Sequence, residues 1–195
     1  MGSRYRTKLA LVELDKADPQ ARELLEKAKK KNKMIPNMYA AMANVPGLLD
    51  TYMTGYQHFR EESGFTPAEQ EVVLLTISFE NGCEYCVAAH SVIADNASRV
   101  PREVTEAIRN AAQIPDSKLR VLAEFTRALL LKRGRPSSED AQAFLAAGYT
   151  EKQILALVLA IAVKTISNYT NHIFETPLDL VFKAREWKTS DPQQA

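Results

Sequence analysis

The chain has 195 residues, and 46% of them are hydrophobic, which is enough apolar surface to bury the core of one compact domain. Its 25 lysines and arginines almost balance its 24 aspartates and glutamates, so the net charge is only +1. A chain this close to neutrality has no global field to attract nucleic acid or an anionic membrane. We therefore expect no nucleic-acid partner and no membrane partner.

Caps, prolines and apolar spacing predict an all-α fold. Asp18 and Pro19 open a segment that closes with lysines, as expected for a capped helix with a cationic end. Apolar residues at three-to-four spacing, bounded by Pro or Ser/Thr/Asp signals, predict the following helices. They cover about residues 36–43, 46–61, 66–80, 83–97, 101–112, 117–133, 137–147 and 150–175. A last short helix is expected after Pro177.

The chain is expected to form one compact helical domain, for which two related helical halves are one possible organisation. No Ser/Gly-rich linker interrupts it, so residues 1–195 are expected to be a single domain with its core at about 35–175. The amino terminus lacks the apolar core of a signal peptide, and the apolar run 154–163 is too short to span a bilayer. We expect a soluble, cytoplasmic protein. In that reducing compartment, paired cysteines are more typical of catalysis or metal binding than of a permanent bridge.

A short sequence pattern occurs twice. G-F-T-P-A-E-Q at Gly64 is similar to G-Y-T-E-K-Q at Gly148, each with a glycine, an aromatic residue and a threonine cap before an apolar helix. The first copy is followed by C-E-Y-C-V-A-A-H and the second by S-N-Y-T-N-H at residues 167–172. Two related helical halves are one interpretation, and two unrelated helices with similar caps are the other.

Both cysteines and one of the three histidines lie within eight positions. Gly82 can end one helix in the left-handed conformation, so a new helix is expected to start at or just after Cys83. At about 100° per residue, Cys83, Cys86 and His90 then share one helix face. A helix start favours a thiolate, an imidazole can take up its proton, and the i, i+3 spacing permits a disulfide. These groups are what a two-electron thiol redox cycle requires.

Two further expectations concern ionisation. Glu71 lies on the face of the preceding helix that carries Leu74 and Leu75, where partial burial would raise the pKa of its carboxyl and suit it to proton transfer. An ordinary surface glutamate is the alternative. The helix dipole by itself favours Cys83, which is nearer the helix start than Cys86, as the thiol with the lower pKa.

The pattern E-x(11)-C-x-x-C-x-x-x-H, formed by Glu71, Cys83, Cys86 and His90, resembles the signature of the alkyl hydroperoxidase D-like group within the carboxymuconolactone decarboxylase superfamily. The segments I-P-N-M-Y-A-A-M and G-F-T-P-A-E-Q-E-V-V-L-L are also similar to peroxidase-related members, so the likeness spans about residues 35–175. The resemblance implies an all-helical fold that assembles as homotrimers or hexamers, and a peroxidase for organic hydroperoxides.

The resemblance also implies residue roles. Cys86 would attack the hydroperoxide, Cys83 would resolve the sulfenic acid as a disulfide, and Glu71 and His90 would relay protons. A dithiol such as dihydrolipoamide, or a partner redox protein, would restore the reduced state. The dithiol is then the only redox group, without metal, haem or flavin.

Tyr85 stands where the best-studied members of the group place a histidine, which leaves that branch of the relay open because a tyrosine titrates near pH 10. His172 and Asn168, with the neighbouring Asn171, are further candidates for the relay, a pocket wall or an oligomer interface.

Five alternatives remain. Two concern the cysteines: a structural pair of buried cysteines, and a zinc site in which Glu71 joins the cysteines and His90. The others are a general thiol–disulfide oxidoreductase, a lactone decarboxylase, and a non-enzymatic oligomeric protein that holds a ligand in an apolar groove.

Overall fold

The computed structural model describes residues 4–189. Every regular element within them is helical, which confirms the predicted all-α class. In chain order the elements of these residues are α1 (Pro19–Asn32), α2 (Asn37–Met42), α3 (Pro46–Glu62), α4 (Pro67–Glu80), α5 (Glu84–Asn96), α6 (Arg102–Arg109), α7 (Ser117–Leu131), α8 (Ser138–Ala146), α9 (Glu151–Phe174) and the 3-10 helix η1 (Leu180–Arg185).

The predicted helix boundaries agree with the structure to within two residues, except at α6. The pattern predicted a helix as far as residue 112, whereas α6 ends at Arg109. Ala111 has a left-handed φ of 53°, and the Ala112 N–H donates to the Ala107 carbonyl at 2.8 Å. This bond closes the helix, and the Trp187 indole donates to the Arg109 carbonyl at 3.0 Å. The C-terminal segment therefore supplies a donor to a carbonyl at the end of α6.

The two copies of the repeated pattern share a local structure. Gly64 and Gly148 both have left-handed φ values, 72° and 90°. Thr66 and Thr150 each form a capping box at the start of the following helix. The copies also contact each other, because the Gln153 side chain donates to the Gly64 carbonyl at 3.0 Å. The starts of α4 and α9 are therefore matched and adjacent.

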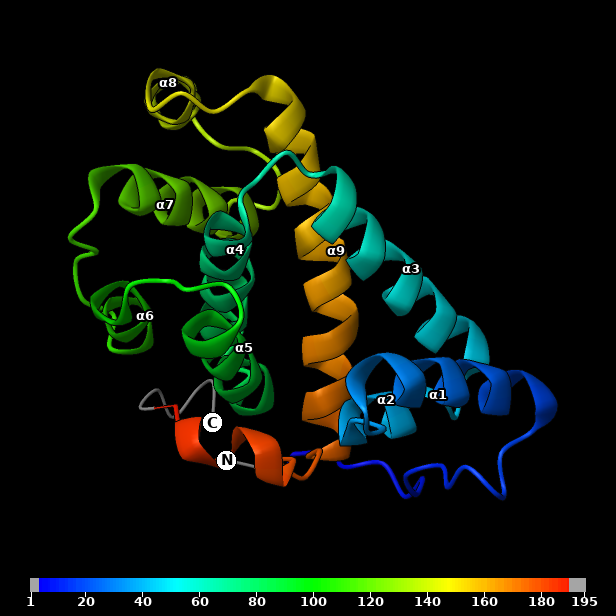
Figure 1. Ribbon diagram of the computed structural model, residues 1–195. Coiled ribbons are helices and arrows are strands. Elements are labelled where there is room, and N and C mark those ends of the chain that lie inside the picture. The colour runs from blue at the N-terminus through cyan, green and yellow to red at the C-terminus, as the bar shows by residue number, and fades with distance from the viewer. Residues whose placement is uncertain (1–3, 190–195) are drawn as a thin grey trace.

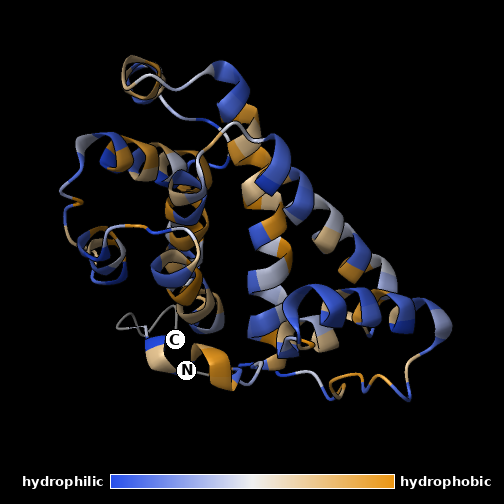
Figure 2. Ribbon diagram, viewed as in Figure 1, coloured by the Kyte–Doolittle hydropathy of each residue, from blue (hydrophilic) through white to orange (hydrophobic). Residues whose placement is uncertain are grey.

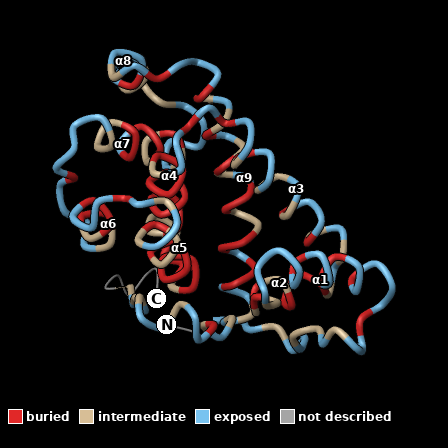
Figure 3. The backbone as a smooth tube through the Cα atoms, in the orientation of Figure 1, coloured by how far each residue is buried: buried red, intermediate tan, exposed pale blue. Residues whose placement is uncertain are grey.

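Helix α9 runs through the middle of the molecule (Figure 1). It packs against α3 on one side and against α4 on the other, while α6 and α7 pack on α4. Helix α4 is buried over most of its length, as Figure 3 shows. The core also extends before the predicted range of about 35–175, because α1 buries Leu25 and Ala28 completely.

Helix α9 combines apolar composition with a buried polar face. Among the described residues, it is the one helix long and apolar enough to cross a membrane by length and composition, and 44% of that apolar window is buried inside the fold. Apolar and polar positions alternate along it (Figure 2). Four of its buried polar residues recur at helical spacing and so share one face. They are Lys164, Ser167, Asn168 and Asn171.

The stacked rings that hold α8 lead to a stability prediction. Phe144 is fully buried, and its ring centroid lies 4.4 Å from that of Phe125 and 4.6 Å from that of Tyr149. We expect Phe144→Ala to lower the free energy of unfolding by about 3–5 kcal/mol, because it removes a large ring and leaves a cavity. Urea unfolding followed by circular dichroism measures this. The control Leu145→Ala, at a side chain 37% exposed, should cost less than about 1 kcal/mol; equal losses would contradict the prediction.

Candidate active site

The turn between α4 and α5 places both cysteines. Gly82 has a φ of 63°, and the Cys83 N–H donates to the Ser78 carbonyl at 2.9 Å. Cys83 is the N-cap residue of α5, and Cys86 lies in its first turn. The predicted helix start is therefore confirmed. Both cysteines are buried and carry free thiols.

One amide group contacts both sulfur atoms. Nδ2 of Asn171, on α9, lies 3.3 Å from Sγ of Cys86 and 3.8 Å from Sγ of Cys83. The two thiols also lie next to each other, and each shifts the pKa of the other. The sulfurs therefore lie on the same side of the backbone, which is the arrangement that a reversible disulfide between them needs.

A row of polar side chains continues behind the cysteines. Arg60 on α3 donates to Oε1 of Glu71. Oε2 of Glu71 lies 2.8 Å from Nδ1 of His90, and Nε2 of His90 lies 3.0 Å from Nζ of Lys164. Lys164 in turn lies beside Cys86 and lowers the pKa of its thiol. Glu71 and Lys164 are completely buried, whereas the Arg60 side chain is 21% exposed, so the row connects the buried thiol with the surface.

The two partners of His90 determine its tautomer. A lysine ammonium has only donors, so Nε2 of His90 must accept from Lys164. Nδ1 then carries the proton and donates to Glu71. Burial, followed by the charge of Lys164, lowers the pKa of His90, which favours this neutral form. Lys164 thus stands between the imidazole and Cys86, a position that the motif alone did not predict.

The ionisation of the two thiols differs from the helix-dipole expectation. Burial by itself raises the pKa of the Cys86 thiol. The interaction with Cys83, the charge of Lys164 and the neighbouring His90 outweigh that effect and hold the pKa well below its ordinary value. Burial, together with the neighbouring Cys86, raises the pKa of Cys83. The prediction that Cys83 has the lower pKa is therefore wrong, because groups on other elements outweigh position within the helix.

The predicted pKa shift of Glu71 is also wrong in direction. Burial favours its neutral form, as expected. The neighbouring His90 and the Arg60 guanidinium stabilise the carboxylate more strongly and hold the pKa below its ordinary value. Glu71 is therefore a fixed anion that orients His90, and Arg60 is the partner that the sequence pattern did not reveal.

The remaining candidates lie around this row. The Tyr85 hydroxyl donates to Asp179 in the C-terminal segment, away from His90. Oδ1 of Asn168 accepts from Asn81 at 2.9 Å and so ties α9 to the α4–α5 turn. His172 and Tyr85 both line a cavity beside the cysteines. Tyr85 and His172 therefore line the cavity, whereas Asn168 does not.

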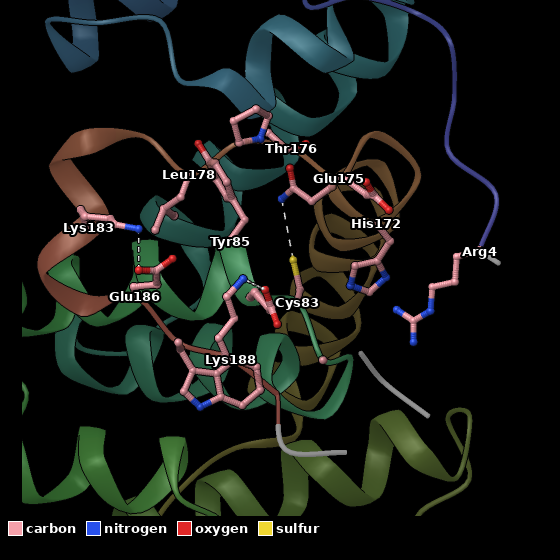
Figure 4. A pocket seen from close by; sticks show the side chains of 15 residues that line it. Arg4, Cys83, Tyr85, His172, Glu175, Thr176, Leu178, Lys183, Glu186 and Lys188 are labelled. Carbon is pink, nitrogen blue, oxygen red and sulfur yellow. Dashed lines mark hydrogen bonds and ion pairs between the residues drawn. The ribbon is translucent and has the colours of Figure 1, made fainter. Parts of the chain in front are cut away.

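That cavity has a volume of about 550 Å³. Cys83 and Asn171 form part of its lining, together with Leu178 and Trp187 from the C-terminal segment. Figure 4 shows Cys83, Tyr85 and His172 around the same space. Cys83 has no exposed surface of its own, so it lies at the closed end of the cavity.

The motif residues do not converge as a metal site. Glu71 is directed to Arg60 and His90, and the remaining nitrogen of His90 contacts Lys164. Within residues 4–189, no group of three or more His, Cys, Asp or Glu side chains is placed to hold a metal ion. A cation at Lys164 would also repel a metal there. The residues present therefore do not fit the zinc alternative.

Two members of the row were missed by the sequence analysis. The sequence does single out Lys164, because it is the one charged residue between Lys152 and Glu175. The other residues of that stretch are apolar or uncharged polar. A lysine at such a position is either buried with partners or marks the exposed face. Arg60 had no comparable signal, because it follows His58 in a helix rich in charged residues.

Comparison with known families gives one match. Residues 46–128 match the model of the carboxymuconolactone decarboxylase family. This segment contains Arg60, Glu71, both cysteines and His90, but not α9 with Lys164 and Asn171. A search of curated proteins found no match.

Solved structures with the same fold cover nearly the whole chain. An uncharacterized peroxidase-related protein from Ralstonia eutropha JMP134, described as an alkylhydroperoxidase AhpD core, has 20% identity and a TM-score of 0.78, covering 92% of this chain and 96% of its own. A peroxidase-related protein from Silicibacter sp. TM1040 has 19% identity and a TM-score of 0.74, covering 94% and 99%. The debrominase Bmp8, as a cysteine-to-alanine variant with 2,3,4-tribromopyrrole, has 16% identity and a TM-score of 0.73, covering 92% and 96%. Residues 46–128 thus resemble the carboxymuconolactone decarboxylase family, and the chain as a whole shares the helical fold of these solved structures.

Proposed function

We propose that the protein is a thiol-dependent peroxidase that reduces organic hydroperoxides through a Cys83–Cys86 dithiol/disulfide cycle. One observation carries the proposal. The two buried thiols lie next to each other beside one amide, and Cys86 is backed by the Lys164–His90–Glu71 row that lowers its pKa. A thiolate is the reactive form of cysteine toward peroxides, and the neighbouring thiol is placed to resolve the product.

The cycle has three balanced steps. The Cys86 thiolate attacks the terminal oxygen of ROOH, the O–O bond breaks, and the alkoxide takes up a proton to leave as ROH. The Cys83 thiol then attacks the sulfenic sulfur of Cys86, and its proton leaves with the hydroxyl group as water. An external dithiol finally reduces the disulfide and is itself oxidised to a disulfide.

Lys164 is the group best placed to handle the proton in the first step. Its ammonium contacts both Cys86 and His90, so it can stabilise the thiolate before attack and donate to the departing alkoxide. His90 accepts a hydrogen bond from the lysine and is held by Glu71. In this proposal Glu71 and His90 are positioning residues, and Lys164 is the catalytic residue that contacts the reacting atoms.

The expected partners follow as proposals. The reductant is a dithiol or a redox protein that reaches the pair through the cavity lined by Cys83. Assembly as a homo-oligomer and a cytoplasmic location complete the proposal. A general thiol–disulfide oxidoreductase is the second candidate, because the same lowered pKa and the same cavity would serve disulfide exchange.

Trapping of the intermediate tests the peroxidase cycle. Reduced protein is mixed with cumene hydroperoxide, and oxidation states are followed by stopped flow and mass spectrometry. We expect a disulfide in the wild type, a trapped sulfenic acid only in Cys83→Ser, and a fall in peroxide consumption of about a hundredfold or more in Cys86→Ser. Equal peroxide consumption by all three would exclude the peroxidase. Exchange with lipoamide disulfide without peroxide turnover would favour the general oxidoreductase.

Removal of the buried cation tests the role of Lys164. We expect Lys164→Met to raise the pKa of Cys86, because the charge that stabilises the thiolate is lost while burial remains. The reaction with hydroperoxide should therefore fall about tenfold per unit of pKa shift at pH values below the new pKa. It should recover only in part as the pH rises above it, because the proton donor to the alkoxide is also lost. Ultraviolet absorbance of the thiolate measures the pKa directly. Lys152→Met, at an exposed position of α9, is the control, and a wild-type titration in Lys164→Met would refute this role.

A further inference from the structure

The side-chain amide of Asn171 has partners for its NH₂ group but none for its carbonyl oxygen among the described residues. The residue is only 4% exposed. Its Nδ2 contacts both cysteine sulfurs, whereas its Oδ1 is buried and has no hydrogen-bond partner among the described residues. Buried carbonyl oxygens are normally hydrogen-bonded, so an unpartnered one beside a cavity indicates a ligand or a water.

The orientation of this amide is fixed by the sulfurs. A thiolate is an acceptor only, so the NH₂ group must be directed toward Cys86. A flipped amide would bring its oxygen against the negative sulfur, which is repulsive. Oδ1 is therefore held as an acceptor close to Cys86, and Asn171 itself forms part of the cavity lining.

We propose that Oδ1 of Asn171 accepts a hydrogen bond from the O–H of a neutral hydroperoxide and so orients its terminal oxygen toward Cys86. This inference rests on the proposed peroxidase function and adds a catalytic residue outside the Glu-Cys-Cys-His motif. The same amide then holds the nucleophile through Nδ2 and the substrate through Oδ1. A peroxide anion or a dialkyl peroxide has no such proton to donate.

The cavity suits a neutral molecule with an organic body. Tyr85, Leu178 and Trp187 provide aromatic and aliphatic surface in its wall. Charged lining residues are paired, with Lys183 bonded to Glu186 and Lys188 bonded to Glu84. Figure 4 shows Lys183 and Glu186 directed toward each other. An alkyl or aryl hydroperoxide meets these walls without having to break an ion pair.

The proposed contact also survives the chemical step. The Cys86 sulfur forms a bond to the O–H oxygen, the O–O bond breaks, and the leaving alkoxide takes its proton from Lys164. The transferred oxygen keeps its hydrogen and becomes the sulfenic acid hydroxyl of Cys86, which can still donate to Oδ1. The sulfenic acid would then be held in place while Cys83 attacks its sulfur.

Two probes separate substrate orientation from thiolate stabilisation. Reduced protein is reacted with tert-butyl hydroperoxide, which donates a hydrogen bond, and with methyl methanethiosulfonate, which has no such donor. Rates are compared for each variant at a pH above the pKa of its own Cys86 thiol, so that ionisation is complete. The measured quantity is the ratio of the hydroperoxide rate to the thiosulfonate rate.

Three variants give distinct expectations. Asn171→Leu removes the acceptor and should lower the ratio by about tenfold or more, the size of a lost hydrogen bond to a reacting group. Asn171→Asp keeps an acceptor oxygen and should retain a ratio near that of the wild type, although its charge raises the pKa of Cys86. Asn168→Leu removes another buried amide of α9 that bonds Asn81, and should leave the ratio unchanged even if both rates fall.

The outcomes distinguish the two proposals. Equal losses with both probes in Asn171→Leu would overturn the orienting role and leave the peroxidase standing. A wild-type protein that reacts with the thiosulfonate but not with the hydroperoxide would overturn the peroxidase, and the orienting role with it. Thermal unfolding followed by circular dichroism confirms that each variant is folded at the assay temperature.

Discussion

The contact between a buried lysine and a buried thiol is the interaction on which this site depends. An ammonium removed from water requires an anion or well-placed polar partners. Lys164 is completely buried, and its partners are the imidazole of His90 and the sulfur of Cys86. The cation and the thiolate therefore stabilise each other, because either of them alone would be a desolvated charge without compensation.

The fold brings this pair together from distant parts of the chain. The two cysteines lie at the start of α5. Glu71 comes from α4 and Arg60 from α3, and Lys164 and Asn171 both come from α9. Helix α9 contacts α3, α4 and α5 along its length. Its buried polar face replaces the water that these groups lose, and its apolar positions keep the helix packed in the core. The start of α9 is matched to that of α4, but the two helices supply different chemistry to one site.

The solved structures with this fold show that a shared architecture does not identify the reaction. Proteins described as peroxidase-related and a protein described as a debrominase have the same helical architecture at 16–20% identity. A scaffold that accommodates both descriptions does not by itself determine a reaction. In this chain the proposed reaction depends on the sulfur pair, the cation behind it and the amide that contacts both sulfurs.

Local structure could be predicted from the order of the residues. Caps and prolines set the helix boundaries, Gly82 set the start of α5, and the spacing of Cys83, Cys86 and His90 set their common face, because these are properties of neighbouring residues. The packing of distant helices sets which thiol has the lower pKa and keeps the pKa of Glu71 below its ordinary value. Lys164 and Arg60, which act across 78 and 11 positions of the chain from Cys86 and Glu71 respectively, control those charges. Electrostatic effects in a buried site depend on distance in space, which a local pattern does not contain.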